Sequence, residues 1–247
     1  MRKGSLYLIF AGLFLLVSAD VFSQIQKPKN DSWYDDKPLH FGFSLGTNLM
    51  DFDITPSQEY LAGGGNFFPE VSFLNPGINI QTVINWRPAK YIDLRFLPGV
   101  SFGQRSVHYY DSKDTIDPKY EAIGDIQRLQ SSFLEFPLLV KFKGDRLNNV
   151  RPYVIGGLNY RYDLAGKKEY EESKLIYLRL KRPDLYYEAG AGLDFYLPYF
   201  KLSVEIKTSR GLRDVVVHDQ GYPGYSQYLD AIEKMQSRIW VVSFHFE

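Results

Sequence analysis

The sequence of 247 residues contains no cysteine, which excludes a disulfide framework, thiolate metal sites and a lipid anchor on cysteine. It also lacks an excess of charge of one sign, because 29 lysines and arginines balance 29 aspartates and glutamates. Nucleic-acid binding normally requires a positive surface, so we expect no nucleic-acid partner. The length suffices for one large β-domain or two small ones.

A hydrophobic run long enough for a membrane-spanning helix is absent as well. The apolar stretch 6–17 covers about 12 residues, whereas a spanning helix needs roughly 20. Two basic residues precede this stretch, and small and polar residues follow it. This order is typical of a secretory signal peptide. We predict that residues 1–23 are a signal peptide cleaved after Ser23, with Ala19 as the second candidate. An uncleaved anchor helix is the alternative.

Aromatic residues are abundant instead, with 19 tyrosines and 18 phenylalanines. Apolar residues, many of them aromatic, recur at every second position in several stretches, as in 131–143, SSFLEFPLLVKFK. Successive side chains of a strand point to opposite faces. The apolar face of this stretch consists of Leu134, Phe136, Leu138, Val140 and Phe142. Glu135 and Lys141 lie on the other face, so the stretch is predicted to be a strand with one apolar and one partly charged side.

Seven other stretches repeat this pattern. The eight predicted strands are 39–53, 77–86, 91–105, 131–143, 152–164, 184–197, 200–209 and 237–247. The connections between them alternate long and short, as they do in bacterial outer-membrane barrels. We therefore predict an all-β fold, an eight-stranded antiparallel transmembrane β-barrel over residues 39–247 with four long external loops. A soluble lipocalin-like barrel is the alternative, because period two alone does not say which face points outward.

Residues 24–38 precede the first strand. They are polar, contain two prolines and show no period, which predicts a flexible periplasmic segment. Inside the later strands, Pro137 cannot donate a hydrogen bond to a neighbouring strand, and a closed barrel has no edge strand. We therefore expect a bulge or a local bend near Pro137.

Charged residues of both signs fall on the inner face of the predicted barrel. They are Asp93, Arg95, Glu135, Lys141, Arg161, Glu188, Asp194, Lys201, Glu205, Lys207 and His245. Eight strands enclose just enough room for side chains, and buried charges need partners. These residues are predicted to form an ion-paired network that fills the lumen, and the barrel is therefore not expected to be a pore.

Several motifs with catalytic associations do not fit the predicted strands. Residues 42–46, GFSLG, match a nucleophile pattern, but that pattern requires a sharp strand-to-helix turn and Ser44 lies within a strand. Gly190 and Gly192 are not followed by a helix, as a dinucleotide site would require. The four histidines lack metal-ligand spacing. No catalytic residue, cofactor or metal is expected.

The stretch 133–142, FLEFPLLVKF, resembles the "yLEiPlLlKy" strand of PorT-type outer-membrane barrels from Bacteroidetes. The residues 22–24 (FSQ), 37–43 (KPLHFGF) and 48–52 (NLMDF) are similar too, so the resemblance covers essentially the whole mature chain. The chain departs from outer-membrane assembly signals at its end, where the aromatic Phe246 is one place before the last residue.

The resemblance implies a non-enzymatic component of type IX secretion, a system that exports proteins with a conserved C-terminal domain and supports gliding motility in some species. It also implies outer-membrane lipid and other secretion components as partners, and no small-molecule substrate. The alternatives are a generic structural or adhesive barrel, an outer-membrane lipid enzyme and a small-solute channel. An enzyme would need an exposed cluster of serine, histidine and an acid, which the sequence does not provide.

Overall fold

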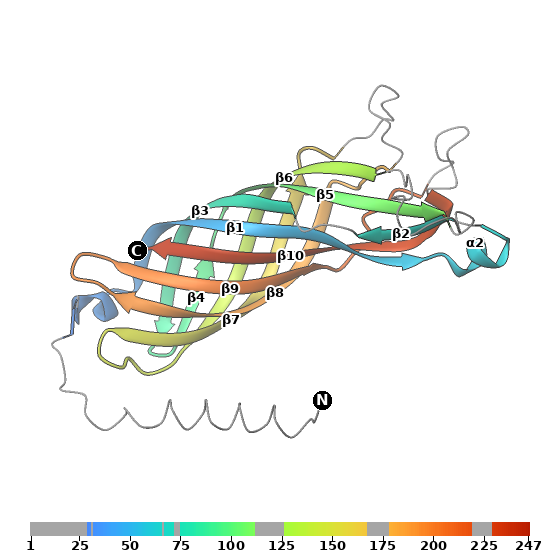
Figure 1. Ribbon diagram of the computed structural model, residues 1–247. Coiled ribbons are helices and arrows are strands. Elements are labelled where there is room, and N and C mark those ends of the chain that lie inside the picture. The colour runs from blue at the N-terminus through green and yellow to red at the C-terminus, as the bar shows by residue number, and fades with distance from the viewer. Residues whose placement is uncertain are drawn as a thin grey trace, which may run out of the picture.

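The computed structural model describes residues 29–30, 32–65, 67–71, 75–111, 126–166, 178–218 and 229–247. Their elements run in the order shown in Figure 1: η1 (Ser32–Asp36), β1 (Leu39–Pro56), α2 (Gln58–Ala62), β2 (Phe67–Val71), β3 (Asn75–Ala89), β4 (Ile92–Phe96), β5 (Gly99–Asp111), β6 (Ile126–Lys143), β7 (Val150–Asp163), β8 (Pro183–Tyr196), β9 (Lys201–Gly211) and β10 (Ile232–Phe246). The predicted signal peptide lies outside the described residues.

The strands form one antiparallel sheet that closes on itself, because β1 pairs with both β3 and β10. β4 and β5 share one place in the ring, since both pair with β3 on one side and with β6 on the other. β2 pairs with β5 outside the ring. The ring therefore has eight strand positions, which confirms the predicted eight-stranded antiparallel barrel.

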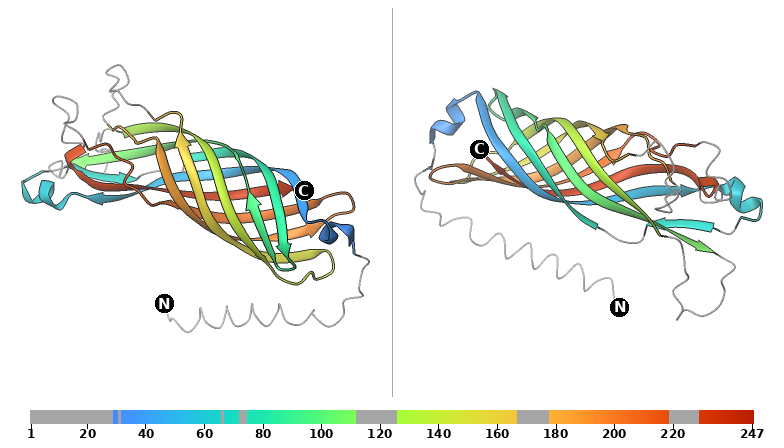
Figure 2. Two further views of the ribbon diagram at one scale, coloured as in Figure 1. Left: turned by 180° about the vertical axis from the view of Figure 1, so that it is seen from behind. Right: turned by 90° about the horizontal axis from the view of Figure 1, so that it is seen from above.

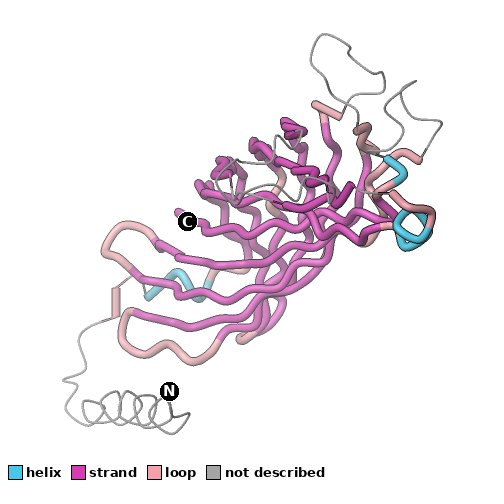
Figure 3. Tube along the Cα trace, turned by 45° about the vertical axis from the view of Figure 1, so that its right-hand side comes forward, coloured by secondary structure: helices cyan, strands magenta, loops and turns pink. Residues whose placement is uncertain are grey.

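The strands are staggered around the ring. Following paired residues once around from Phe41 returns to β1 at Asp51, ten residues further along the chain. Such a stagger requires the strands to tilt against the barrel axis, and Figure 3 shows this tilt. The same view places η1 and α2 at opposite ends. We call the end with η1 and the short connections the turn end, and the end with α2 the loop end.

The predicted third strand is interrupted at Leu97 and Pro98, where β4 ends and β5 begins. The Leu97 N–H donates to the carbonyl of Pro137 (3.2 Å), and the Thr82 N–H donates to the carbonyl of Pro98 (2.9 Å). The return bonds cannot form because neither proline has an N–H. Of the bulge or local bend that we expected near Pro137, the bulge is wrong, since β6 runs through Pro137 in unbroken register with β7. The irregularity lies instead in the neighbouring position of the ring.

The outer surface of the ring is apolar. Its exposed side chains include Leu39, Phe41, Phe43, Leu45, Ile78, Ile80, Leu138, Phe142, Val154, Leu158, Leu193, Ile206 and Phe244. Exposed aromatic residues lie toward the strand ends, among them Trp86 and Tyr91 at the turn end. A closed sheet of this polarity has no free strand edge to expose to lipid, which is the condition for crossing a membrane with strands.

β1, β5, β6 and β10 continue past the ring on one side, toward β2 and α2 (Figures 1 and 2). Their inward-facing side chains pack with residues of two loops in an apolar cluster that we call the outer core. It consists of Phe52, Val107, Tyr109, Leu129, Leu178, Leu180, Val215, Val216, Leu229, Ile232 and Met235. The β6 part of this extension begins at Ile126, within the connection 106–130 that the sequence predicted.

Candidate functional site

The lumen of the barrel is filled mostly with polar side chains, which surround an apolar cluster of Val83, Leu97, Leu139, Tyr153 and Ile155. All eleven charged residues that period two puts on the inner face are at most 3% exposed. They come from β4, β6, β7, β8, β9 and β10, and each faces inward because its strand neighbours face the apolar outer surface. The geometry of their pairing differs between the middle of the lumen and the turn end.

In the middle of the lumen, Arg161 of β7 lies between two carboxylates. Its Nε is 2.8 Å from Glu135 Oε1 on β6, and its Nη2 is 3.0 Å from Glu188 Oε1 on β8. Lys207 Nζ on β9 is 3.1 Å from Glu188 Oε2. Four neighbouring strands are thus joined by alternating charges, and Gln81 donates to Glu135 from the far side (2.7 Å).

Toward the turn end, the pairs converge on the last residue of the chain. Arg95 Nη2 lies 2.7 Å from Glu247 Oε1, and Lys201 Nζ lies 3.0 Å from Glu247 Oε2. Lys141 Nζ donates to both carboxylate oxygens of Asp194 at 2.8 and 2.9 Å. All of these side chains are fully or almost fully buried.

Glu205 joins the turn-end pairs to the middle of the lumen. Its Oε2 lies 3.6 Å from Arg95 Nη1 and 3.5 Å from His245 Nε2, and its Oε1 lies 3.9 Å from Lys207 Nζ. Tyr153 also donates to Glu205 (2.9 Å). The eleven predicted residues are therefore not isolated pairs but neighbours along one continuous interior.

The structure adds lumen residues that our sequence-based set omitted. Lys143 pairs with Asp93, and Arg105 Nη2 lies 3.3 Å from Asp163 Oδ2. Lys143 and Asp163 lie two residues after Lys141 and Arg161 and therefore point to the same face of their strands. The alternation of the sequence could have identified them. Glu247 lies on the same face as His245 within the predicted strand 237–247, so the alternation could have found it as well.

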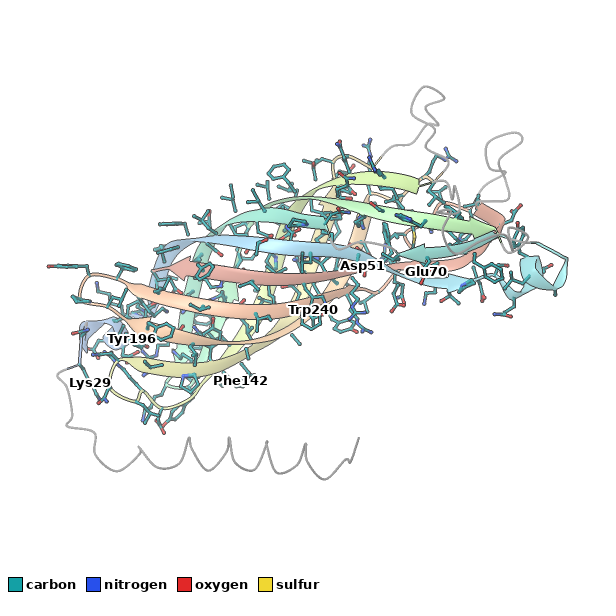
Figure 4. All side chains as sticks on the ribbon, in the orientation of Figure 1. Lys29, Asp51, Glu70, Phe142, Tyr196 and Trp240 are labelled. Atoms are coloured by element: carbon teal, nitrogen blue, oxygen red, sulfur yellow. The ribbon has the colours of Figure 1, made fainter. Side chains whose placement is uncertain are left out.

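η1 lies across the turn end of the lumen. Its Tyr34 ring stacks on His40 with centroids 3.8 Å apart, and the Tyr34 hydroxyl donates to Glu247 Oε2 (2.8 Å) and accepts from Lys201 Nζ (2.6 Å). Burial, followed by the charge of Glu247, raises the pKa of the Tyr34 phenol well above its usual value. Tyr196, labelled beside this segment in Figure 4, packs edge-on against Tyr34.

Asp35 ties η1 to two strands. Its carboxylate receives two hydrogen bonds from Arg151 of β7 (both 2.9 Å) and one from Arg87 of β3 (2.8 Å). Burial on its own would raise the pKa of Asp35, but the hydrogen bonds and charges of Arg151 and Arg87 outweigh it and hold the pKa below its usual value. The sequence predicted a flexible segment at 24–38, whereas residues Ser32–Asp36 form a 3-10 helix held by side chains.

The motifs with catalytic associations can be located in the described residues. Ser44 of the GFSLG motif is 1% exposed within β1, so it does not sit on the exposed turn that a nucleophile needs. No group of three or more metal-ligating side chains occurs among the described residues. In the same part of the chain, no helix is long and apolar enough to cross a membrane.

Comparison with known protein families identifies the family to which this barrel belongs. Residues 22–217 match the family model "Outer membrane protein beta-barrel domain". The chain belongs to this family. It is an outer-membrane β-barrel, and because short turns face the periplasm in such proteins, the turn end is the periplasmic end. A search of curated proteins finds no match.

Three solved outer-membrane β-barrels are similar to this family member at low identity. OprG from Pseudomonas aeruginosa is 10% identical, with a TM-score of 0.44, covering 84% of this chain and 92% of its own. Ail, the attachment invasion locus protein of Yersinia pestis, is 11% identical, with a TM-score of 0.36 and coverage of 83% and 96%. The N-terminal barrel of Pseudomonas aeruginosa OprF is 11% identical, with a TM-score of 0.32 and coverage of 82% and 96%.

Proposed function

We propose that this outer-membrane barrel is a non-enzymatic accessory or structural component of type IX protein secretion. The filled lumen is the observation that supports a structural role over the role of a channel. Arg161, Glu135 and Glu188 pair in its middle, and η1 covers its periplasmic end. A barrel of this kind acts through its two ends and its outer surface.

The link to secretion is supported by sequence resemblance. FLEFPLLVKF at 133–142 lies in β6, where Glu135 and Lys141 point into the lumen and bind partners from other strands. The resemblance to PorT-type barrels therefore involves residues that stabilise the closed interior. The expected partners are other secretion components, met at the outer core or at the periplasmic turns, together with outer-membrane lipid.

The experiment that tests this proposal is the location of type IX cargo in a clean deletion strain of the source organism. We expect cargo to accumulate in the periplasm, and a plasmid copy of the full chain to restore export. Normal surface display of cargo in the deletion strain would contradict the secretion role.

The matched control is complementation with a variant altered on the exposed surface, Arg128→Gln on β6, which should restore export as the wild type does. Outer-membrane integrity is measured in parallel by leakage of a periplasmic enzyme. If the deletion causes leakage while cargo is displayed normally, the barrel is a structural or adhesive protein, which is the second candidate function.

A further inference from the structure

The outer surface of the barrel carries two arginines directly opposite each other. Arg210 of β9 pairs with Arg238 of β10, and both point outward, because their strand neighbours Ser209 and Ser237 are buried on the lumen side. Directly opposite residues have Cβ atoms about 4.5–5.5 Å apart, and like charges in that arrangement repel each other. Such a pair requires an anion nearby to be favourable.

The described part of the chain provides a directly paired anion for only one of the two arginines. Asp51 of β1 pairs with Arg238 on its other side, but no hydrogen bond or ion pair joins the side chain of Arg210 to any described residue. The Nε of Arg238 is buried and has no hydrogen-bond partner in the described residues. The two arginines and their one directly paired aspartate carry a local charge of +1, while the next outward carboxylate, Asp53, lies opposite Gln236 and not opposite either arginine. Within the described part of the chain, the donors of the Arg210 side chain and the Nε of Arg238 stay unused.

The depth of the pair in the membrane follows from its aromatic neighbours. Tyr187 of β8 is the direct partner of Arg210, and Trp240 lies two residues from Arg238 on the same face of β10. Both rings are exposed, by 41% and 39%, as expected of an interfacial aromatic girdle. Two residues of a strand span about 6–7 Å, which places the arginines in the headgroup layer of the outer leaflet. Figure 4 labels Trp240 and Asp51 at this level.

We propose that Arg210 and Arg238 together bind a phosphomonoester on the headgroup of an outer-leaflet lipid. Guanidinium groups match phosphate oxygens with paired, charge-assisted hydrogen bonds. A phosphomonoester carries a charge of about −1.5 to −2 at neutral pH, so it neutralises the pair better than a zwitterionic headgroup does. Tyr187 and Trp240 would contact the first part of the lipid chains. This inference does not depend on the secretion role.

The test uses the full chain in phosphatidylcholine nanodiscs doped with diphosphorylated lipid A or with the same lipid after phosphatase treatment. Lipid retained per protein after detergent extraction is quantified by mass spectrometry. We expect the wild type to retain the phosphorylated lipid about tenfold better, and each of Arg210→Gln and Arg238→Gln to lose most of that preference. Arg128→Gln, an exposed arginine of β6 outside the pair, should retain it.

Three results would overturn the proposal. The first is equal retention of both lipids by the wild type, and the second is an unchanged preference in the Arg210→Gln and Arg238→Gln double variant. The third is displacement of the lipid by excess inorganic phosphate, which would make the pair a site for free phosphate. Folding is monitored by heat-modifiable gel migration, and the double variant should remain folded because the substitutions remove a repulsive contact.

Discussion

The inside of this barrel is built in two different ways along the same strands. In the membrane ring, the inward face of β1 carries Ser44 and Asn48, whereas further along the chain it carries Phe52 of the outer core and Ile54, which packs against it. The lumen is thus held by charges and hydrogen bonds, and the outer core is held by apolar packing. Both interiors are buried, so burial alone does not decide their chemistry.

The outward face changes in the opposite sense. On β10, Trp240 and Phe244 are exposed within the ring, Arg238 lies at its outer boundary, and Lys234 is exposed beyond it. Lipid surrounds the first region and water the second, and each requires the outward face to match it. The comparison teaches that the polarity of both faces inverts where the strands leave the membrane, while the period of two continues as far as the register shift between Thr55 and Pro56 of β1.

The largest expected effect is on the charged interior. Arg161→Met leaves Glu135 and Glu188 without their shared cation and should lower the free energy of unfolding by about 3–5 kcal/mol. Urea unfolding of the full chain in detergent, followed by tryptophan fluorescence, measures it. The control Arg128→Met, on the exposed surface, should change stability by no more than about 0.5 kcal/mol. A loss as small as that of the control would show that the lumen pairs are not needed.

The outer core should respond differently to a truncation. Met235→Ala removes a fully buried side chain and should cost about 2–4 kcal/mol. Because the outer core lies outside the ring, we expect amide hydrogen exchange to accelerate in 105–111 and 232–238 but not in the ring. Uniform acceleration throughout the barrel would mean that the two regions unfold as one unit.

The contacts of η1 should weaken in acid. The pKa of Asp35 is lower in the folded protein than in the unfolded chain, so its stabilising effect is fully present above the unfolded pKa of about 3.9 and is lost as the pH falls through the lower, folded pKa. Limited proteolysis of the N-terminal segment across this range measures it. Asp35→Asn should weaken docking by about 1 kcal/mol and remove this acid dependence. An unchanged pH profile in the variant would assign the effect to another group.

The smallest effect is expected at an exposed ion pair. Lys181 Nζ lies 3.8 Å from Asp214 Oδ2, and the lysine side chain is 47% exposed. Lys181→Ala should change stability by no more than about 0.5 kcal/mol, in contrast to Arg161→Met. An effect of several kcal/mol in the same urea assay would show that these loops hold the outer core more tightly than their exposure suggests.

Much of the ring could be predicted from the sequence because the alternation that marks each strand is a local feature of the chain. Leu134, Glu135 and Phe136 alternate between apolar and charged because successive side chains of a strand point to opposite faces. This alternation identified the eight strand positions. The break at Leu97 and Pro98 was not found, because it depends on Pro137 lying opposite in the neighbouring strand. The alternation within one strand does not tell which residue lies opposite in the neighbouring strand.

The ends of the barrel were harder to predict for a different reason. Ile126 and Leu129 lie in the predicted connection 106–130, but they belong to β6, and Leu129 packs in the outer core. η1 has no period at all, and its position depends on Tyr34 reaching Glu247 more than two hundred residues away. Both features are stabilised by contacts between distant parts of the chain.

The central claim is that the interior of the membrane ring is closed by its own side chains. Conductance of the purified full chain in planar bilayers tests this most directly. We predict no stepwise current at moderate voltage, both for the wild type and for Asp35→Asn, because the pairs around Arg161 fill the lumen without η1. Steady, uniform conductance steps from the wild-type protein would contradict the account and make the barrel a channel.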